Sequence, residues 1–177
     1  MQRLSREELL TAFRSGRRQF RELDLSGIDL FQENLRGIDL ERALLQDAYL
    51  PYTNLSQANL KEAVLLRSQL GDAQLYDSDL SQADLSAAAL MRATMCGCML
   101  QQASLRGSNL DGADLRGADL RGADLRGASL VKANLEGALL QQADLRGCNL
   151  FRAVGVAMEE GVCDRTTICP DGHRHSL

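Results

Sequence analysis

The sequence has no tryptophan and few other aromatic residues, with four phenylalanines and three tyrosines among 177 residues. Large rings usually dominate the packing of a globular core. Here 45% of the chain is hydrophobic, mainly leucine and alanine, so a core must be built from small and branched aliphatic side chains. That composition predicts one elongated domain with a narrow, regular interior.

Long apolar runs and signal-like segments are also missing. The first residues, Met1 to Glu8, carry charges with no apolar stretch after them, and no run approaches the about 18 residues of a membrane span. We therefore expect a cytoplasmic protein that does not contact a membrane. The five cysteines are an odd number and predict reduced thiols rather than a disulfide framework.

Neither a strong excess of one charge nor a catalytic motif is present. Lys plus Arg number 20 against 24 Asp plus Glu, a balance that creates no field suited to nucleic acid. Both histidines lie close to the C-terminus, and no glycine-rich phosphate loop or known metal or redox motif occurs. The sequence therefore predicts that the protein is not an enzyme and uses no cofactor or small-molecule substrate.

What the sequence does contain is a five-residue repeat. Leucine recurs at every fifth position from 25 to 150, with Met95 as the one exception, which makes 26 consecutive repeats in register. We call this residue the centre of the repeat. Two positions before it stands a small residue, usually alanine, and two positions after it often glycine, as in the run from Ala113 to Gly127.

A period of five fits neither a helix nor a straight strand, because both would spread the leucines over several faces. The chain must therefore turn within every repeat, with a short extended side followed by a corner. The centre and the small residue then share an inward face, and glycine suits a corner that needs positive φ. Four sides close a square coil of about 20 residues, and stacked coils form a parallel β-helix.

The Ala-(Asp/Asn)-Leu-x-x pattern, clearest from Ala113 to Leu130, resembles that of pentapeptide-repeat proteins, and the resemblance covers residues 20–153. It implies an all-β fold, a right-handed quadrilateral parallel β-helix. The plan of the chain, with a Pro170-Asp-Gly172 segment close to its end, is similar to that of cyanobacterial members. The family is functionally diverse, so the resemblance implies a fold more firmly than a function.

The two ends of such a β-helix expose strand edges, which would template aggregation unless they are covered. Ser5 and Glu8 form a capping-box pattern, and an apolar stripe at helical spacing follows it. We therefore predict a capping α-helix over residues 5–15, within an N-terminal segment of residues 1–19. A partner-binding peptide is the alternative interpretation.

Glu33 breaks the repeat by placing a carboxylate at an inward position. Burying a lone charge costs free energy, so we expect Glu33 to lie at the open first coil. There it would meet an arginine of the N-terminal segment, residues 1–19, which we call the lid. The candidates are Arg14, Arg17 and Arg18.

The repeat stops after Ala153, and residues 154–177 are interpreted as a C-terminal cap with a mobile end. Zinc binding is one hypothesis for this segment, because it holds four side chains of metal-ligating type. Their spacing matches no common zinc site, so an irregular cap without metal is favoured. The four residues are Cys163, Cys169, His173 and His175.

Four repeats per coil place every fourth centre on one side of the rod. The side with centres 30, 50, 70, 90, 110, 130 and 150 collects most outward apolar groups and is neutral, so it is the candidate partner face. The side with centres 40 to 140 is the most acidic, at −2. Alternatively, the apolar groups are ordinary scattered surface residues, and Phe31 and Phe151 touch the end caps. The candidate residues are Phe31, Tyr49, Pro51, Tyr52, Met91, Val131 and Phe151.

We predict a non-enzymatic binding scaffold that mediates protein–protein interaction, with an unidentified protein partner or a second copy of the chain as a homodimer. Asp and Arg pairs such as Asp114 and Arg116 are interpreted as solubilising surface charges. One alternative is a DNA mimic that inhibits a type II topoisomerase such as gyrase, as some members of the resembling family do. Mimicry needs a strongly negative rod, and arginines from 106 to 126 neutralise much of the charge. The other alternative is a purely structural role.

Overall fold

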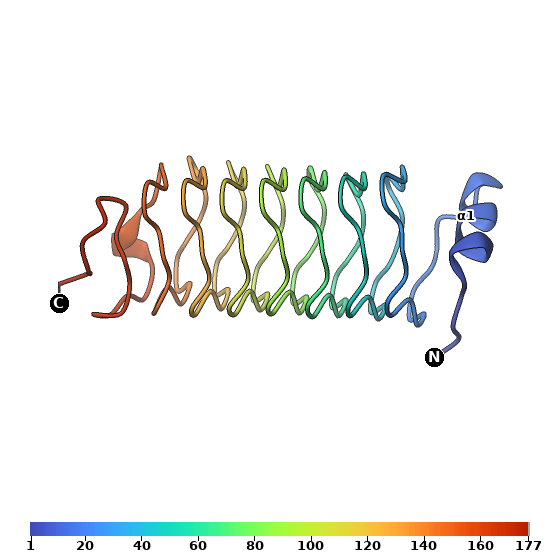
Figure 1. Cartoon of the computed structure of the whole chain (residues 1–177), viewed down its shortest axis with the longest axis horizontal. Coiled ribbons are helices and arrows are strands. Elements are labelled where there is room, and N and C mark those ends of the chain that lie inside the picture. Colours follow the sequence, from blue (N-terminus) through green and yellow to red (C-terminus); the bar gives the residue numbers. More distant parts are fainter. Residues whose placement is uncertain (177) are drawn as a thin grey trace.

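The computed structural model describes residues 1–176 as a rod of stacked coils with a helix at one end (Figure 1). The helix, α1, spans Arg6–Arg14, and a single-turn 3-10 helix, η1, spans Met158–Glu160 close to the other end. Within the described chain, the sides of the coils form isolated β-bridges rather than longer strands. The rod is therefore built from turns and single bridges, one of each per repeat.

Each repeat turns at a corner of the same geometry. The residue two positions after the centre has positive φ at every corner from 22 to 152, with values such as 58° at Tyr52 and 65° at Gly117. The next residue donates its N–H to the carbonyl of the centre, 3.0 Å from Ala43 N to Leu40 O. Positive φ at the third of four residues is the requirement of a type II turn. Glycine was expected here, but many corners carry side chains, because bonds to the neighbouring coils hold the backbone in this conformation.

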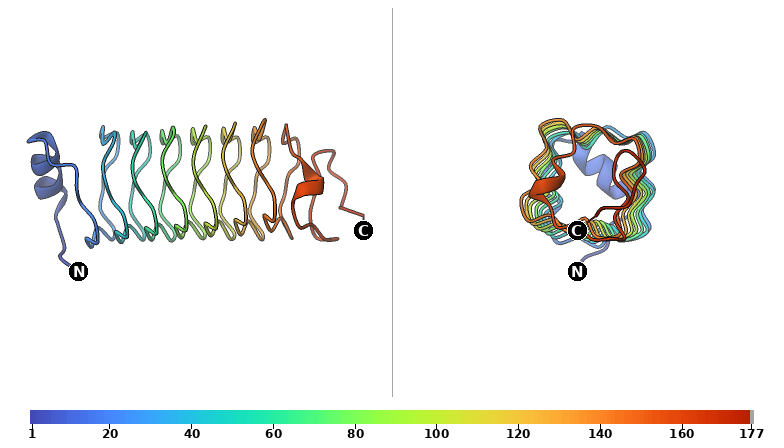
Figure 2. Two further views of the ribbon diagram at one scale, coloured as in Figure 1. Left: turned by 180° about the vertical axis from the view of Figure 1, so that it is seen from behind. Right: turned by 90° about the vertical axis from the view of Figure 1, so that its left-hand side faces the viewer.

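Successive coils stack in parallel, with a register of four repeats. Asn54 bridges Gln74, Gln74 bridges Thr94, and the same offset continues along the rod. A centre donates its N–H to the next coil, as in Leu55 N to Gln74 O at 2.7 Å, and the residue before a centre donates to the previous coil, as in Gln74 N to Thr53 O at 3.0 Å. The view along the rod shows the four sides that this register creates (Figure 2).

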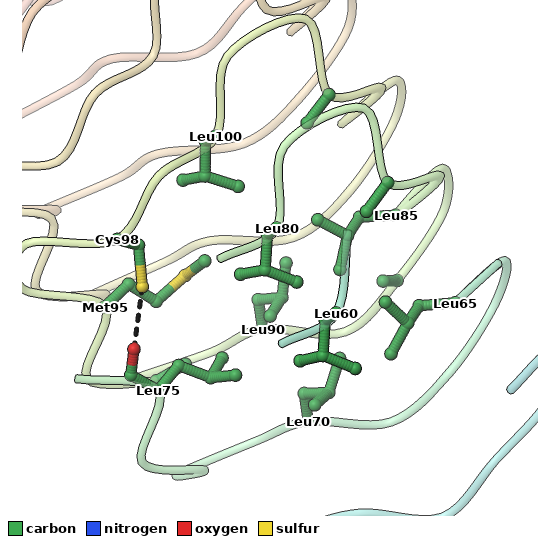
Figure 3. Close-up of a cluster of buried hydrophobic side chains, with 14 of the residues drawn as sticks. Leu60, Leu65, Leu70, Leu75, Leu80, Leu85, Leu90, Met95, Cys98 and Leu100 are labelled. Carbon is green, nitrogen blue, oxygen red and sulfur yellow. Dashed lines mark hydrogen bonds between the residues drawn. The ribbon is translucent and has the colours of Figure 1, made fainter. Parts of the chain in front are cut away.

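The interior is filled by the two inward positions of the repeat. The leucine centres are at most 2% exposed, and the alanines two positions before them are almost as buried. Figure 3 shows leucines of successive coils in stacked rows, with Met95 in one leucine position. A hydroxyl or thiol at the small position bonds a core carbonyl: Ser78 Oγ and Cys98 Sγ donate to Leu75 O at 2.7 and 2.8 Å.

The helix α1 lies across the open end of the first coil (Figure 2). The predicted capping box is present, because Ser5 Oγ accepts from the Glu8 N–H at 3.2 Å and the Glu8 carboxylate accepts from the Ser5 N–H at 2.8 Å. The apolar stripe of the helix faces the core, so α1 covers the first coil. Its members are Leu9 and Leu10, which are buried, and Leu4 and Phe13, which are partly buried.

Glu33 forms two ion pairs with the lid. Its carboxylate lies 2.6 Å from Arg6 and 3.3 Å from Arg14, and its side chain is 18% exposed. The prediction of Arg14 is confirmed, whereas Arg6 was missed. Arg17 and Arg18 were wrong, because their guanidinium groups instead lie over the rings of Phe20 and Phe13, at 4.6 and 4.2 Å.

Stacking continues beyond the last repeat. Val162 bridges Asp144 and Ile168 bridges Asn149, so the chain adds one further, irregular coil after residue 154. Backbone hydrogen bonding reaches His175, whose N–H donates to a carbonyl of this coil at 2.9 Å. The end of the segment 154–177 was predicted to be mobile. Its described residues are instead bonded to the rod, and only residue 177 lies outside the described residues.

Candidate partner-binding face

The candidate face is the side of the rod whose centres are residues 30, 50, 70, 90, 110, 130 and 150. Its outward positions are the residue before each centre and the two corner residues after it. Of the seven predicted residues, five are exposed over 37–51% of their surface and two are half-buried. The exposed ones are Phe31, Tyr49, Tyr52, Met91 and Phe151, and the half-buried ones are Pro51 and Val131.

Three aromatic side chains of this face pack together. The ring of Phe31 stacks on Tyr49, with centroids 5.9 Å apart and planes at 24°, and it meets Tyr52 edge to face at 5.9 Å and 87°. Both geometries are favourable for aromatic pairs. Pro51 lies between the tyrosines in the sequence. We call Phe31, Tyr49, Pro51 and Tyr52 the aromatic cluster.

Met91 does not join the aromatic cluster. It stands in a column where Gly71, one coil nearer to the cluster, presents no side chain, so the apolar surface is interrupted. Beside this gap an Arg92 guanidinium nitrogen lies 2.6 Å from the carboxylate of Asp72. The hydrogen bond from Arg92, with a smaller contribution from Tyr52, lowers the pKa of Asp72. The cluster is thus bordered by a closed ion pair.

Phe151 belongs to the C-terminal end of the rod. A Cβ added to Gly172 would lie 3.2 Å from its ring, and the guanidinium of Arg152 lies 5.1 Å from the ring centroid. Val131, one coil earlier, donates its N–H to the carboxylate of Asp111 at 3.1 Å. The alternative of an end-cap contact is therefore correct for Phe151, while Phe31 packs on the two tyrosines.

The opposite side also exposes apolar groups, which the sequence pattern did not predict. On the side with centres 40 to 140, Met99 and Leu139 are each 40% exposed, although the same column otherwise holds polar residues. The break in that polar column is the sequence signal that could have found them. Leu139 borders an open depression of about 680 Å³, whose other lining residues are Gln101, Gln102, Arg121, Gly122, Gln141 and Gln142.

The Asp and Arg pairs of the later repeats are closed ion pairs. Arg116 donates to both carboxylate oxygens of Asp114, at 2.9 and 2.7 Å. Hydrogen bonding by Arg116 is the main reason that the pKa of Asp114 falls to about 2. Pairs of the same kind form in three other repeats, so these carboxylates present little net negative charge: Asp119 with Arg121, Asp124 with Arg126, and Asp144 with Arg146.

The four candidate metal ligands of the C-terminal segment do not converge. Cys169 Sγ lies 4.0 Å from His175 Nδ1, while His173 Nδ1 faces the carboxylate of Asp171 at 3.3 Å. Over residues 1–176, no group of three or more His, Cys, Asp or Glu side chains is placed to hold a metal ion. Burial also raises the pKa of Cys163 and of Cys169, which is the opposite of what activates a thiol.

Stacked repeats, a continuous leucine core and covered ends define the class: a β-helical solenoid, a repeat protein in which each unit contacts its neighbours. The sequence model described as pentapeptide repeats matches eight copies between residues 24 and 154. The chain belongs to the pentapeptide repeat family.

Solved structures are similar to most of the chain. QnrB1, described as a plasmid-mediated fluoroquinolone resistance protein, is 18% identical in a trypsin-treated form, with a TM-score of 0.62 over 82% of this chain and 79% of that chain. HetL, a pentapeptide repeat protein involved in heterocyst differentiation regulation from the cyanobacterium Nostoc, is 29% identical over 97% of this chain and 100% of that chain, with a TM-score of 0.37. The QnrB1 likeness shows the fold alone, a right-handed β-helix.

No curated protein sequence matches the chain. In the part of the chain that the structure describes, no helix has the length and apolar character needed to cross a bilayer.

Proposed function

We propose that this protein is a non-enzymatic scaffold that holds a protein partner on the aromatic cluster. The observation that carries the proposal is the packing of Phe31, Tyr49 and Tyr52 into one exposed group on a rigid rod. Aromatic side chains, and tyrosine in particular, are enriched at the centres of protein interfaces. Because backbone bonds to neighbouring coils already hold this surface in place, binding sacrifices little conformational entropy.

The partner is expected to present an apolar segment to this site. The cluster offers flat ring surfaces and two hydroxyl groups, and it contains no Asp, Glu, Lys, Arg or His. Polar groups border it, with Gln32 at the corner next to Phe31 and the Asp72–Arg92 ion pair on the coils that follow the tyrosines. An apolar centre with a polar rim is the usual arrangement of a protein interface.

The family supports a binding role, since pentapeptide repeat proteins are generally structural or binding proteins rather than enzymes. All five cysteines are free, and Cys98 and Cys148 are buried with pKa values raised to about 12. Free thiols are the usual state of cysteine in a reducing compartment, which supports the cytoplasm as the proposed location.

DNA mimicry toward a type II topoisomerase has weaker support. The fold shared with QnrB1, a fluoroquinolone resistance protein, is what raises it. A mimic must replace one phosphate charge about every 1.7 Å. On the most acidic side of the rod, four carboxylates are instead paired with arginines: Asp39, Glu41, Glu62 and Asp119. Inhibition of gyrase supercoiling by micromolar protein would favour mimicry over the scaffold, and absence of inhibition would dismiss it.

The scaffold proposal is tested by affinity capture from native cell extract. The bait variant Tyr49→Ser/Tyr52→Ser removes most of the aromatic cluster, and Tyr76→Ser, 44% exposed on the neighbouring side, is the matched control. We expect a partner that wild type and Tyr76→Ser retain and that the double variant loses, with equal melting temperatures for all three. A partner that the double variant retains in full would contradict the proposal.

A further inference from the structure

The side of the rod opposite the aromatic cluster contains a surface with two nearly identical coils, one on either side of a different middle coil. Three stacked coils, with centres 100, 120 and 140, form it, and we call it the glutamine face. Its outer coils are nearly alike, with Met99-Leu-Gln-Gln102 on one and Leu139-Leu-Gln-Gln142 on the other. The middle coil differs and carries Asp119-Leu-Arg-Gly122. The likeness extends along the chain, since residues 99–110 and 139–150 are near copies, and it places equivalent groups at equal distances from the middle coil.

The outer coils supply apolar and amide groups. Met99 and Leu139 are each 40% exposed at positions that are polar in the other coils of this side. The glutamines at 101, 102, 141 and 142 line the depression together with Leu139. A glutamine amide both donates and accepts hydrogen bonds, so a row of glutamines is complementary to a second row of glutamines. Gln101 Nε2 already donates to Asp119 Oδ2 at 2.6 Å, and the amide oxygen of Gln101 is the group that would accept from the partner.

The middle coil lies under the depression and contributes no net charge. Gly122 stands between the two glutamine corners without a side chain, and the depression of about 680 Å³ lies over it. The only charges of this coil on the glutamine face are Asp119 and Arg121, which form a closed pair with Arg121 Nε 2.8 Å from Asp119 Oδ1. The pair leaves the centre of the glutamine face neutral.

We propose that a second copy of this chain binds the glutamine face, in an antiparallel dimer whose two-fold axis runs between the middle coils of the two copies. A two-fold interface must be complementary to itself. The rotation sets Met99 against Leu139 of the partner subunit, and it sets Gln101 and Gln102 against the glutamines of the partner's other outer coil. The hollow at Gly122 then receives the ends of glutamine side chains from both copies.

The side with centres 40 to 140 is the most acidic overall, but the glutamine face within it has no net charge, so charge does not oppose contact between copies there. Residues 22–177 carry 14 Lys and Arg against 22 Asp and Glu, so the net negative charge of the rod lies outside the glutamine face. The glutamine face is neutral and combines apolar with amide groups. Its three coils make a small interface, so we expect a reversible dimer rather than an obligate one.

This dimer would leave both aromatic clusters on its outer sides. If the proposed function holds, the assembly is a bivalent scaffold, and two linked sites bind a partner with repeated segments more tightly than one. The dimer itself does not depend on the proposed function, since the two surfaces lie on opposite sides.

The dimer is tested by sedimentation velocity at protein concentrations from about 1 to about 500 µM. This range includes the dissociation constants expected for a small interface. We expect Met99→Glu/Leu139→Glu to weaken dimerisation at least about tenfold, because the charges oppose each other across the axis. The control, Tyr76→Glu/Val154→Glu, adds two charges at apolar positions of similar exposure on another side and should dimerise as wild type does. A wild type that stays monomeric throughout, or equal weakening by the control, overturns the proposal.

Disulfide cross-linking tests the antiparallel arrangement. A mixture of Met99→Cys and Leu139→Cys proteins should form disulfides between unlike copies, identified by peptide mapping, whereas each variant alone should form far fewer. Cross-links only between like residues would overturn the antiparallel dimer. Partner capture through the aromatic cluster is measured separately with the Met99→Glu/Leu139→Glu variant, so failure of the dimer and failure of the proposed function are distinguishable.

Discussion

The two halves of the rod use their charged residues differently. In the first half, arginines reach carboxylates of neighbouring coils, as Arg42 does with Glu62 and Arg67 with Asp47, both at 2.8 Å. From residue 114 onward each close pair lies within one repeat, and the contacts between coils are longer, at 3.6 and 3.9 Å. Backbone bonds and leucines connect the coils in both halves, and close ion pairs between coils are added to them in the first half.

The corners differ in the same way. In the first half, residues with side chains adopt the left-handed conformation, and the same residues form the ion pairs between coils, as at Asp47 (φ 58°) and Arg67 (φ 56°). In the second half glycine occupies most corners, among them Gly107, Gly117 and Gly127. The left-handed conformation costs a residue with a Cβ about 1–2 kcal/mol, which glycine avoids. The same corner conformation is thus formed in two ways. In the first half it is adopted by strained residues whose side chains form ion pairs between coils, and in the second half mostly by glycine, which is not strained.

Removal of the lid is expected to destabilise the protein more than any other change, and it affects the first half of the rod. Without residues 1–18 the apolar interior and bridge edges of the first coil are open, and Glu33 loses both arginines. Size-exclusion chromatography with light scattering should show aggregates. The control is Thr11→Ala, at an exposed position of α1, which should stay as wild type. A monomeric truncation of unchanged stability would show that the lid is dispensable.

Overpacking the core should affect both halves equally. Ala58 and Ala118 are at most 1% exposed at equivalent inward positions, so replacing either one with phenylalanine should lower the free energy of unfolding. The expected loss is about 1–3 kcal/mol for each variant, measured by chemical denaturation. A loss at only one of the two sites would mean that the halves differ in their cores as well as in their surfaces.

Exchange of corner residues should produce changes of opposite sign. Gly117→Ala should destabilise by about 1 kcal/mol, because positive φ strains alanine although no atom lies within 4 Å of the added Cβ. Ala87→Gly, at a first-half corner with φ 55°, should stabilise by up to about 1 kcal/mol. Denaturation midpoints measure both. Changes of the same sign would refute the account of the two kinds of corner.

Acid should produce the smallest effect, through the carboxylates. The pKa of Asp114 is depressed to about 2, so its contribution to stability is complete above the unfolded pKa of about 3.9 and is lost as pH falls through the folded value. Because the pair is near the surface, we expect less than about 1 kcal/mol. Asp114→Asn should reduce the fall in melting temperature between neutral pH and pH about 2. NMR titration of Asp114 with a pKa near that of the unfolded chain would contradict the ion pair, and Asp47, whose pKa is lowered by Arg67, offers the cross-coil comparison.

The fold was largely predictable because the repeat leaves few solutions. Leucine at every fifth position can be buried in one shared interior only if the chain turns once per repeat, and the four-repeat register follows from closing the coil. The aromatic cluster was predictable as residues of one side, since Phe31 and Tyr49 fall on adjacent coils. Its packing geometry, and the ion pair between Asp72 and Arg92 beside it, depend on side-chain positions that the pattern does not specify.

By itself, the sequence determined the inward positions, the corners and the side on which each residue lies, because a strict period converts position in the chain directly into position in space. Tertiary structure alone decided that Arg6 joins Arg14 at Glu33, that residues with side chains occupy left-handed corners, and that Gly172 packs on Phe151. These features bring together segments outside the repeat or from different coils. Their contacts depend on where the chain ends fold and which rotamers fit, and no local pattern encodes either.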